Sequence, residues 1–434
     1  MRNRIIFWVV IPILLVMGCS KGEDHVQEVI LEIQPQSVEL DGAGDRQALV
    51  IRSSACWTAD CPDSWCQITP SAGKAGQDTL YVSAEQNPDN AVKKTTLTVT
   101  AGGILRTVTV TQQGYSPDGS SYAYLTASKG KGVKIVVMGD GFTIGDVAPG
   151  GKYDKAMQQA VDYLLDIEPF KSYRDYFTAW VVRAVSNESG ISDYSEGKDT
   201  RFRAKYTSAT STIMTCDTAI CFEYACKAPI ENKLDETLVI LVTNSSRYAG
   251  TTYMYTSGAS IAICPMAAKL PYETFKGIVQ HEAGGHGFAK LIDEYVYSPE
   301  TLPDDKAEWI RDHEKYGFYA NVDLTDDLTQ IKWKHFIGKP AYDAVGAFEG
   351  GYKYAKGIWR PEQISCMDDM RPYFNAPSRE AIVKRICQLA GLDYSFEDFL
   401  ANDKAAGSVP QAIRNFFEPL PAPVVIHGSP FRAK

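Results

Sequence analysis

Two histidines and a glutamate stand together in one stretch, Gly277 to Tyr295, which reads GIVQHEAGGHGFAKLIDEY. His281, Glu282 and His286 are the residue types of a zinc-hydrolase helix, in which both imidazoles ligate the metal. In such a helix the glutamate does not ligate the ion but holds and deprotonates a metal-bound water. The stretch therefore predicts a Zn²⁺ site in which Glu282 is the catalytic base.

The histidines are one residue further apart than in the common H-E-x-x-H pattern. Five residues of a regular α-helix turn about 500°, which leaves the two rings about 140° apart and unable to share an ion. A π-bulge, a single wide turn, absorbs such an inserted residue. Gly284 and Gly285 permit that distortion, although each costs about 1 kcal/mol against alanine in a plain helix. We therefore predict a bulged zinc helix. A buried helix with incidental histidines and a metal-free relic of a peptidase are the alternatives.

A third protein ligand is required if zinc is to keep three ligands and an open position. Carboxylates follow His286 by seven and eight residues. A continued helix would rise about 10 Å over seven residues, so the chain has to turn back, and Gly287 is a suitable place to leave the helix. The candidate ligands, in order of preference, are Asp293, Glu294 and the more distant Glu300 and Glu308. Without a metal, Asp293 and Glu294 would be an ordinary acidic loop.

The motif G-G-H-G-F-x-x-L-x-D-E-Y, at Gly284 to Tyr295, resembles the zinc motif of the IgA-peptidase family of bacterial metallopeptidases. Several members of that family share the longer histidine spacing. Further segments that resemble the family's are Ile135–Thr143, Glu168–Phe170, Ser186–Gly190 and Ser365–Met367. The resemblance covers roughly residues 131–391 and implies a metzincin-like zinc endopeptidase. Cleavage of IgA is known for some members only and is not carried over.

Met367 fits the methionine turn that metzincins place beneath the zinc as an apolar floor, and its alternative is an ordinary buried methionine. The hairpin at residues 244–264 shortly precedes the zinc helix. In metzincin-like folds the edge strand before that helix pairs with an extended substrate through backbone hydrogen bonds. The resemblance thus implies that this edge binds peptide, and a surface loop without a role in binding is the alternative.

The start of the chain predicts a lipoprotein signal at residues 1–18. A basic start precedes the apolar run Ile5–Val16, which is too short to span a bilayer. The end of this run resembles a bacterial lipobox, in which Cys19 is lipidated and becomes the new N-terminus; the alternative is a plain signal peptide. Residues 19–27 would form a tether. We therefore expect a protein of the bacterial cell envelope, anchored by lipid to the outer membrane or cell surface.

Residues 28–115 contain short alternating runs of apolar and polar residues separated by Gly, Asp and Asn. This period and size indicate a small, all-β, Ig-like sandwich. The Trp57 segment, the N-P-D-N turn at 87–90 and the closing T-V-T-V-T-Q-Q-G at 107–114 resemble the BACON domain, for which carbohydrate or mucin binding is proposed. Trp57 and Trp65 could stack on sugar, although at least one is expected in the core. The sequence supports two hypotheses for this domain equally, a role as a spacer or in adhesion and a role in glycan binding.

The composition of residues 116–122 predicts a flexible linker. Residues 123–434 are predicted to form the zinc metallopeptidase domain, with an irregular C-terminal tail. The unbroken apolar run Ile135–Met138 predicts a strand buried on both faces. A helical stripe of apolar residues follows at 153–165. Together they indicate an α/β (α+β) domain, so the whole chain is expected to be multidomain.

The composition restricts the function further. A length of 434 residues suggests two or three domains. A net charge of -9 without a basic cluster argues against nucleic-acid binding. Of the 10 cysteines nine follow Cys19, and in an exported protein they predict disulfides of open connectivity.

We therefore expect an exported, lipid-anchored zinc metalloendopeptidase that cleaves extracellular proteins or glycoproteins. Zinc on His281, His286 and Asp293 would activate a bound water, and Glu282 would take its proton. The alternative is a non-catalytic, glycan-binding surface lipoprotein with a degenerate peptidase domain, and metal content separates the two hypotheses.

Overall fold

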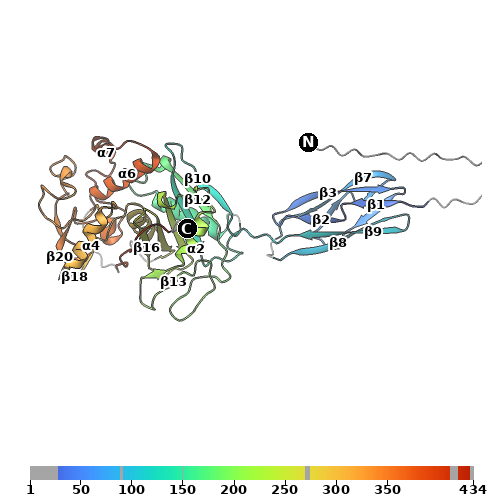
Figure 1. Cartoon of the computed structure of the whole chain (residues 1–434), viewed down its shortest axis with the longest axis horizontal. Helices are drawn as coiled ribbons and strands as arrows, with labels where there is room; N and C mark the ends of the chain where they lie inside the picture. The colour runs from blue at the N-terminus through green and yellow to red at the C-terminus, as the bar shows by residue number, and fades with distance from the viewer. Residues whose placement is uncertain (1–27, 88–90, 149, 269–273, 411–418, 431–434) are drawn as a thin grey trace, which may run out of the picture. The chain divides into compact units, whose positions relative to one another are not determined.

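The computed structural model describes residues 28–87, 91–148, 150–268, 274–410 and 419–430. The predicted signal, the tether and the lipidation of Cys19 lie outside the described residues. The chain divides into two compact units, Met1–Ser116 and Pro117–Lys434 (Figure 1). Each unit has a hydrophobic core of its own. No helix within the described ranges is long and apolar enough to cross a membrane.

Unit 1 is β-rich, and its strands form two sheets with the orders β1-β3-β7-β5 and β2-β9-β8-β4-β6. The strands of the first sheet are β1 (Leu31–Gln34), β3 (Asp45–Ser53), β5 (Gln67–Thr69) and β7 (Gly76–Ala84). Those of the second are β2 (Ser37–Leu40), β4 (Trp57–Asp60), β6 (Ala72–Gly73), β8 (Lys93–Ala101) and β9 (Ile104–Gln112). Neighbouring strands pair antiparallel, except that β2 and β9 run parallel.

The core of unit 1 draws side chains from both sheets. Successive side chains of a strand point to opposite faces, so β7 buries Leu80 and Val82 and leaves Tyr81 between them exposed. Trp57 also lies in this core and is only 1% exposed, so it cannot stack on a sugar. Trp65 is partly buried against the same core. The expectation that at least one of the two tryptophans belongs to the core is confirmed.

Unit 2 is built on a mixed sheet with the strand order β10-β12-β11-β15-β17-β16-β21. The strands β12, β11, β15 and β17 run parallel, whereas β10 and β16 are antiparallel to the strands beside them, and β21 is parallel to β16. Their bounds are β10 (Ser121–Leu125), β11 (Val133–Asp140), β12 (Phe177–Val182), β15 (Thr237–Thr243), β16 (Thr251–Tyr255), β17 (Ser260–Pro265) and β21 (Val424–Ile426).

Both faces of this sheet are covered. Ile135 and Val137 of β11 enter one core, and Val136 and Met138 enter the other, because side chains alternate along a strand. The first core is packed by α1 (Lys152–Leu164), α6 (Ala376–Ala390) and η3 (Val279–Phe288), and the second by α2 (Thr218–Ala225). The prediction of a strand buried on both faces is therefore confirmed, and unit 2 is an α/β unit.

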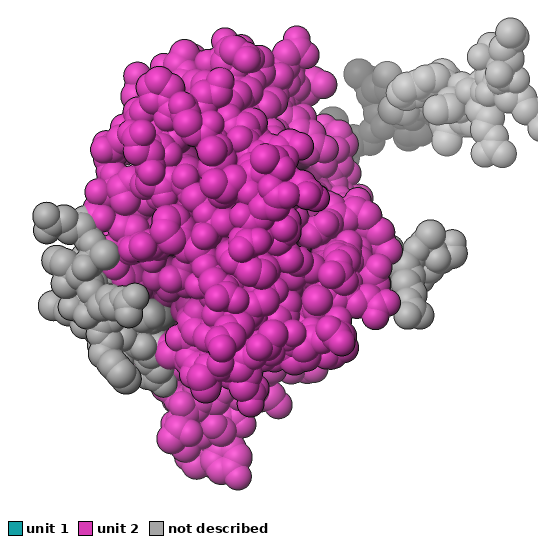
Figure 2. Space-filling model, turned by 90° about the vertical axis from the view of Figure 1, so that its left-hand side faces the viewer, with its two compact units in different colours: residues 1–116 teal, residues 117–434 magenta. Residues whose placement is uncertain are grey.

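The remaining elements of unit 2 surround this sheet, and its described atoms form one continuous body on the face that Figure 2 shows. Two smaller sheets have the orders β13-β14 and β18-β20-β19. The further strands are β13 (Lys205–Tyr206), β14 (Met214–Thr215), β18 (Val296–Thr301), β19 (Phe348–Gly351) and β20 (Lys353–Arg360). The further helices are η1 (Arg174–Tyr176), η2 (Leu234–Glu236), α3 (Phe275–Ile278), α4 (Asp304–Glu314), η4 (Lys334–Phe336), α5 (Cys366–Asp369) and α7 (Phe396–Asn402).

The end of the chain differs from the prediction of an irregular tail. Val424–Ile426 form β21, which pairs with β16. Proline cannot donate a ladder hydrogen bond, and this argued against a strand in the segment with Pro419, Pro421 and Pro423. Val424–Ile426, which directly follow Pro423, nevertheless pair with β16. The prediction of an irregular tail is wrong for these residues.

The cysteines that the structure describes are free thiols. Cys216 and Cys221 have Sγ atoms 3.8 Å apart. The disulfides expected from the sequence are therefore not formed between the described cysteines.

Candidate metal centre

The two histidines lie on one π-helix, η3, which directly continues α3 and is 10 residues long. Hydrogen bonds in a π-helix run between residues five apart, and the bond from Ala289 N–H to the Gly284 carbonyl (3.2 Å) follows that pattern. Residues five apart therefore share a face, and the His281 and His286 ring centroids are 4.7 Å apart. The widening predicted from the histidine spacing is present, but it extends over the whole segment instead of a single turn.

The glycines of η3 allow other residues to approach its backbone. A Cβ at Gly285 would lie 2.2 Å from Met367 Sδ and 2.9 Å from Met367 Cε. A Cβ at Gly284 would lie 3.2 Å from Leu164 Cδ1 and 3.3 Å from a ring carbon of Phe170. Met367 is fully buried, and its thioether adjoins Gly285, the residue before His286. The glycine pair thus allows close packing as well as the widened shape of the helix.

Gly285→Ala is expected to lower the free energy of unfolding by about 1–3 kcal/mol, the usual cost of overpacking a core. The added methyl group would overlap the thioether of Met367, which would have to shift although it is fully buried. Chemical denaturation measures the difference. Gly197→Ala is the matched control because a Cβ there meets nothing within 4 Å. Equal losses in the two variants would contradict the close contact.

The chain leaves η3 through a turn at Lys290, which has a φ of 56°. The Leu291 N–H donates to the Gly285 carbonyl (3.0 Å), and Lys290 Nζ donates to the Gly287 carbonyl (2.8 Å). These bonds satisfy carbonyl groups that the helix end leaves without partners. The reversal brings the following segment, which carries Asp293, back beneath the helix. Gly287, which the sequence favoured as the exit, remains within η3.

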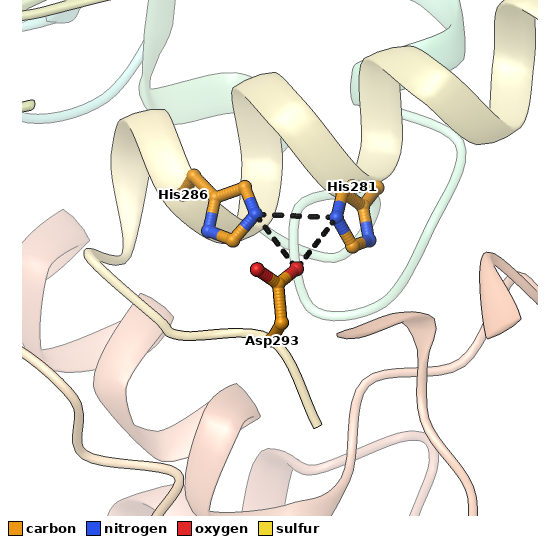
Figure 3. A group of neighbouring side chains, drawn as sticks. All are labelled: His281, His286 and Asp293. Carbon is orange, nitrogen blue, oxygen red and sulfur yellow. Dashed lines mark hydrogen bonds and ion pairs between the residues drawn. The ribbon is translucent and has the colours of Figure 1, made fainter. Parts of the chain in front are cut away.

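Three ligand atoms converge on one point (Figure 3). His281 Nε2 and His286 Nε2 are 3.2 Å apart, and each lies 3.2 Å from Asp293 Oδ1. Three ligands of a tetrahedral zinc ion, at about 2.0–2.1 Å from the metal, are about 3.3–3.4 Å apart. The triangle therefore has the size of one face of a zinc tetrahedron, with the fourth position left for water or substrate.

Backbone carbonyls fix the orientation of both rings. His281 Nδ1 lies 2.9 Å from the Cys366 carbonyl, and His286 Nδ1 lies 2.8 Å from the Leu291 carbonyl. A carbonyl oxygen only accepts hydrogen bonds, so each Nδ1 carries the proton and each Nε2 presents a lone pair. Such outer contacts hold metal-binding histidines in the required tautomer.

The triangle fits a cation better than it fits a hydrogen-bond network. Two lone-pair nitrogens and a carboxylate oxygen repel one another unless positive charge stands between them. Within the described residues neither carboxylate oxygen of Asp293 has a hydrogen-bond partner, although this side chain is fully buried. Two imidazoles and one carboxylate are a ligand set of catalytic zinc sites.

Glu282 lies beside the triangle without belonging to it. Its Oε2 accepts a hydrogen bond from the Thr252 hydroxyl of β16 (2.5 Å), whereas Oε1 has no partner within the described residues. Burial raises the pKa of Glu282 to about 7, against the opposing effects of His281 and Thr252. A carboxylate with one anchored and one available oxygen, and a pKa near neutrality, suits a general base.

Glu294 points away from the ligand triangle. Its Oε1 accepts from Asn321 Nδ2 (2.7 Å) and Asn375 Nδ2 (2.8 Å), and its Oε2 accepts from the Ser365 hydroxyl (2.6 Å). Burial raises its pKa to about 7, although these donors oppose the shift. Glu294 therefore connects its own segment to the segments that carry Asn321, Ser365 and Asn375. Of the two carboxylates, Asp293 is the one that faces the two histidines. The alternatives Glu300 and Glu308 are exposed and lie outside the triangle.

Asp293→Asn and Glu294→Gln are expected to have different effects. The first removes the anionic ligand, so the zinc content of the purified chain should fall well below one per chain. The second should keep the zinc and lower the free energy of unfolding by about 1–3 kcal/mol, because an amide donor would face groups that already donate. Metal analysis and chemical denaturation of both variants measure the two effects. Loss of zinc in Glu294→Gln alone would reverse the assignment.

Several contributors to the site could not be found by motif. Thr252 of β16 holds the Glu282 carboxylate, and the Cys366 carbonyl orients His281. Tyr295 is buried and donates its hydroxyl to the Leu420 carbonyl. Burial and the nearby Asp293 carboxylate raise the pKa of Tyr295. The D-E-Y sequence pointed to this tyrosine only as part of a family motif.

A buried triangle of two imidazoles and a carboxylate, with a glutamate beside it, gives unit 2 the kind of site found in metallopeptidases. Residues 124–341 match the IgA Peptidase M64 family, and the chain belongs to that family. Residues 30–115 match the Viral BACON domain. The suspected family and the suspected N-terminal domain are both confirmed.

Comparisons with other known proteins add little. None of the curated proteins is similar enough to the chain to count as a match. A Bacteroides ovatus GH5 xyloglucanase in complex with a XXXG heptasaccharide is 16% identical, over 53% of this chain and 46% of that chain, with a TM-score of 0.20. The NMR structure of a protein from Bacteroides thetaiotaomicron is 13% identical, over 23% of this chain and 99% of that chain, with a TM-score of 0.16. Similarities this low support no conclusion about function.

Proposed function

We propose that unit 2 is a metzincin-like, zinc-dependent endopeptidase that hydrolyses peptide bonds in extracellular proteins or glycoproteins. The observation that supports this most is the triangle of His281, His286 and Asp293, whose edges of 3.2 Å suit a tetrahedral zinc ion. The membership of the chain in a peptidase family points in the same direction.

The residues of the chain have separate tasks in this proposal. When bound, zinc would supply a Lewis acid for the scissile carbonyl and for water. Glu282 would take a proton from the attacking water through its available Oε1 and pass it to the leaving amine. Thr252 holds the other carboxylate oxygen, so the base keeps one orientation through both transfers. Met367 would be the apolar floor beneath the histidines, as in the methionine turn of metzincins.

β16 is the strand on which we place the substrate. It carries Thr252, and it contacts η3 directly. In metzincin-like folds an extended peptide pairs with the corresponding edge strand, and backbone hydrogen bonds supply affinity without strict sequence preference.

The N-terminal part of the chain would hold the peptidase unit at a cell surface. We propose that Cys19 is lipidated, that the protein is held on the outer membrane or cell surface of a bacterium, and that unit 1 is an Ig-like sandwich acting as a spacer or binding glycan. Because Trp57 is in the core, a glycan site would have to use other residues of unit 1.

The test is metal content together with cleavage. Residues 20–434, purified without chelator or added metal, should contain about one zinc per chain. The same preparation should cleave unfolded proteins or a panel of glycoproteins that includes immunoglobulins and mucins. Absence of zinc even after reconstitution would overturn the proposal and would direct attention to glycan binding by unit 1.

A further inference from the structure

The predicted catalytic residues are enclosed in this structure. His281 is 2% exposed, and Glu282, His286 and Asp293 are 0% exposed. A protein substrate has to touch both the metal and the base, so it cannot react while these groups are covered. A segment from the far end of the chain contributes to the cover.

Leu420 lies next to the general base. It is 2% exposed and belongs to the same core as Ala283 and Met367. A Cβ built at Gly250 would be 2.6 Å from Glu282 Oε1 and 3.0 Å from Leu420 Cδ1, so both groups adjoin the same point. The side chain of Leu420 and the Glu282 Oε1 atom therefore border the same small space at Gly250.

Polar contacts hold the backbone at this position. The Tyr295 hydroxyl donates to the Leu420 carbonyl, and Tyr295 follows the ligand Asp293 by two residues. The Thr212 hydroxyl donates to the Pro419 carbonyl (3.4 Å). The backbone carbonyl of Leu420 is thus bound by a side chain from the segment that carries Asp293.

The residues that follow occupy the edge of the sheet. Val424, Val425 and Ile426 pair in parallel with Tyr253, Met254 and Tyr255 of β16. Beyond the strand, the Thr256 N–H donates to the Ile426 carbonyl (3.0 Å), and the Ser257 N–H donates to the Gly428 carbonyl (3.3 Å). Without these residues β16 would be the open edge of the sheet beside the metal helix, where an extended peptide adds as a strand.

We propose that residues 419–429, the C-terminal strap, occupy the peptide-binding edge of β16 and the space above Glu282, and that substrate binds only when the strap is displaced. This inference rests on the proposed function, because it concerns access to the same site. The occupant is part of the chain, so its effective concentration at the site is high and independent of protein concentration. Displacement or removal of the strap would activate the enzyme.

The experiment compares three forms of the zinc-loaded chain from residue 20: one ending at Lys434, one ending at Pro430 as the matched control, and one ending at Glu418. Two rates are measured, the rate at which a chelator removes the zinc and the rate of cleavage of an unfolded protein. The form ending at Glu418 should exceed the other two in both rates by about tenfold or more, as expected if the strap is closed in at least about nine molecules in ten. A synthetic peptide of residues 419–430 should inhibit the shortened form competitively, and a scrambled peptide should not.

Leu420→Gly in the full chain provides the test if the shortened form does not fold. It removes the buried side chain that anchors the strap, so the strap should be displaced more often, and both rates should rise while the thermal unfolding curve stays cooperative. Equal rates in all zinc-containing, active forms would contradict the proposal that the strap blocks substrate, and they would leave the proposed function intact. If no form binds zinc or cleaves protein, the proposed function is overturned, and the strap with it.

Discussion

Replacing Glu282 with glutamine is expected to lower the kcat of peptide hydrolysis by about 10²- to 10⁴-fold, the usual contribution of a general base. Glutamine has nearly the same shape and can still accept a hydrogen bond from the Thr252 hydroxyl, which now bonds Oε2. It cannot take a proton from water at neutral pH. The zinc content should stay unchanged because Glu282 is not one of the converging ligands.

The measurement is kcat on a peptide substrate together with zinc per chain in the same preparation. Glu300→Gln is the matched control, because Glu300 is exposed on β18 and lies outside the ligand triangle. It makes the same chemical change without touching the site and should retain wild-type activity. Retained activity in Glu282→Gln would show that another group acts as the base. Loss of zinc in this variant would show that Glu282 contributes to binding the metal.

His281→Ala has the second large effect, which is loss of the metal itself. The variant retains two of the three ligand atoms, and the Cys366 carbonyl loses its imidazole partner. A ligand that binds only the folded state stabilises it by RT ln(1 + [L]/Kd), about 2.7 kcal/mol when free zinc is 100 times its Kd. Wild-type protein should therefore unfold at a higher temperature with zinc than without it, and the variant should not.

Metal analysis and thermal unfolding with and without zinc test this. His335→Ala is the control, because His335 pairs with Glu380 in another part of unit 2 (3.0 Å). It should keep both the zinc and the zinc-dependent shift in unfolding temperature. A His281→Ala variant that still contains one zinc per chain, with an unchanged shift, would exclude His281 as a ligand.

The parts of the site that could be predicted are those carried by residue type and short spacing. Two histidines five residues apart with a glycine pair between them required a widened helix, and η3 is one. The continuous apolar run of β11 similarly fixed a buried strand, because only a sheet covered on both faces accommodates it. These inferences depend on local geometry alone.

The parts that could not be predicted depend on contacts between distant segments. After η3 the chain turns at Lys290 and not at a glycine. The Lys290 Nζ bonds to the Gly287 and Ala259 carbonyls and holds a conformation that the backbone alone disfavours. The choice between Asp293 and Glu294 depends on how far this turn rotates the chain. β21 was missed because its partner, β16, is far away in sequence.

The geometry of η3 also has a consequence for recognising such sites in other chains. A pattern that demands histidines four residues apart assumes an α-helical backbone, and it would discard this sequence although its ligand atoms are 3.2 Å apart. The ligand atoms of such a helix can still converge when the inserted residue is taken up as a π-helix and glycines allow the neighbouring side chains to pack closely. Insertions of this kind can therefore be tolerated within a motif, and sequence filters for metal helices should permit a five-residue spacing when glycines lie between the histidines.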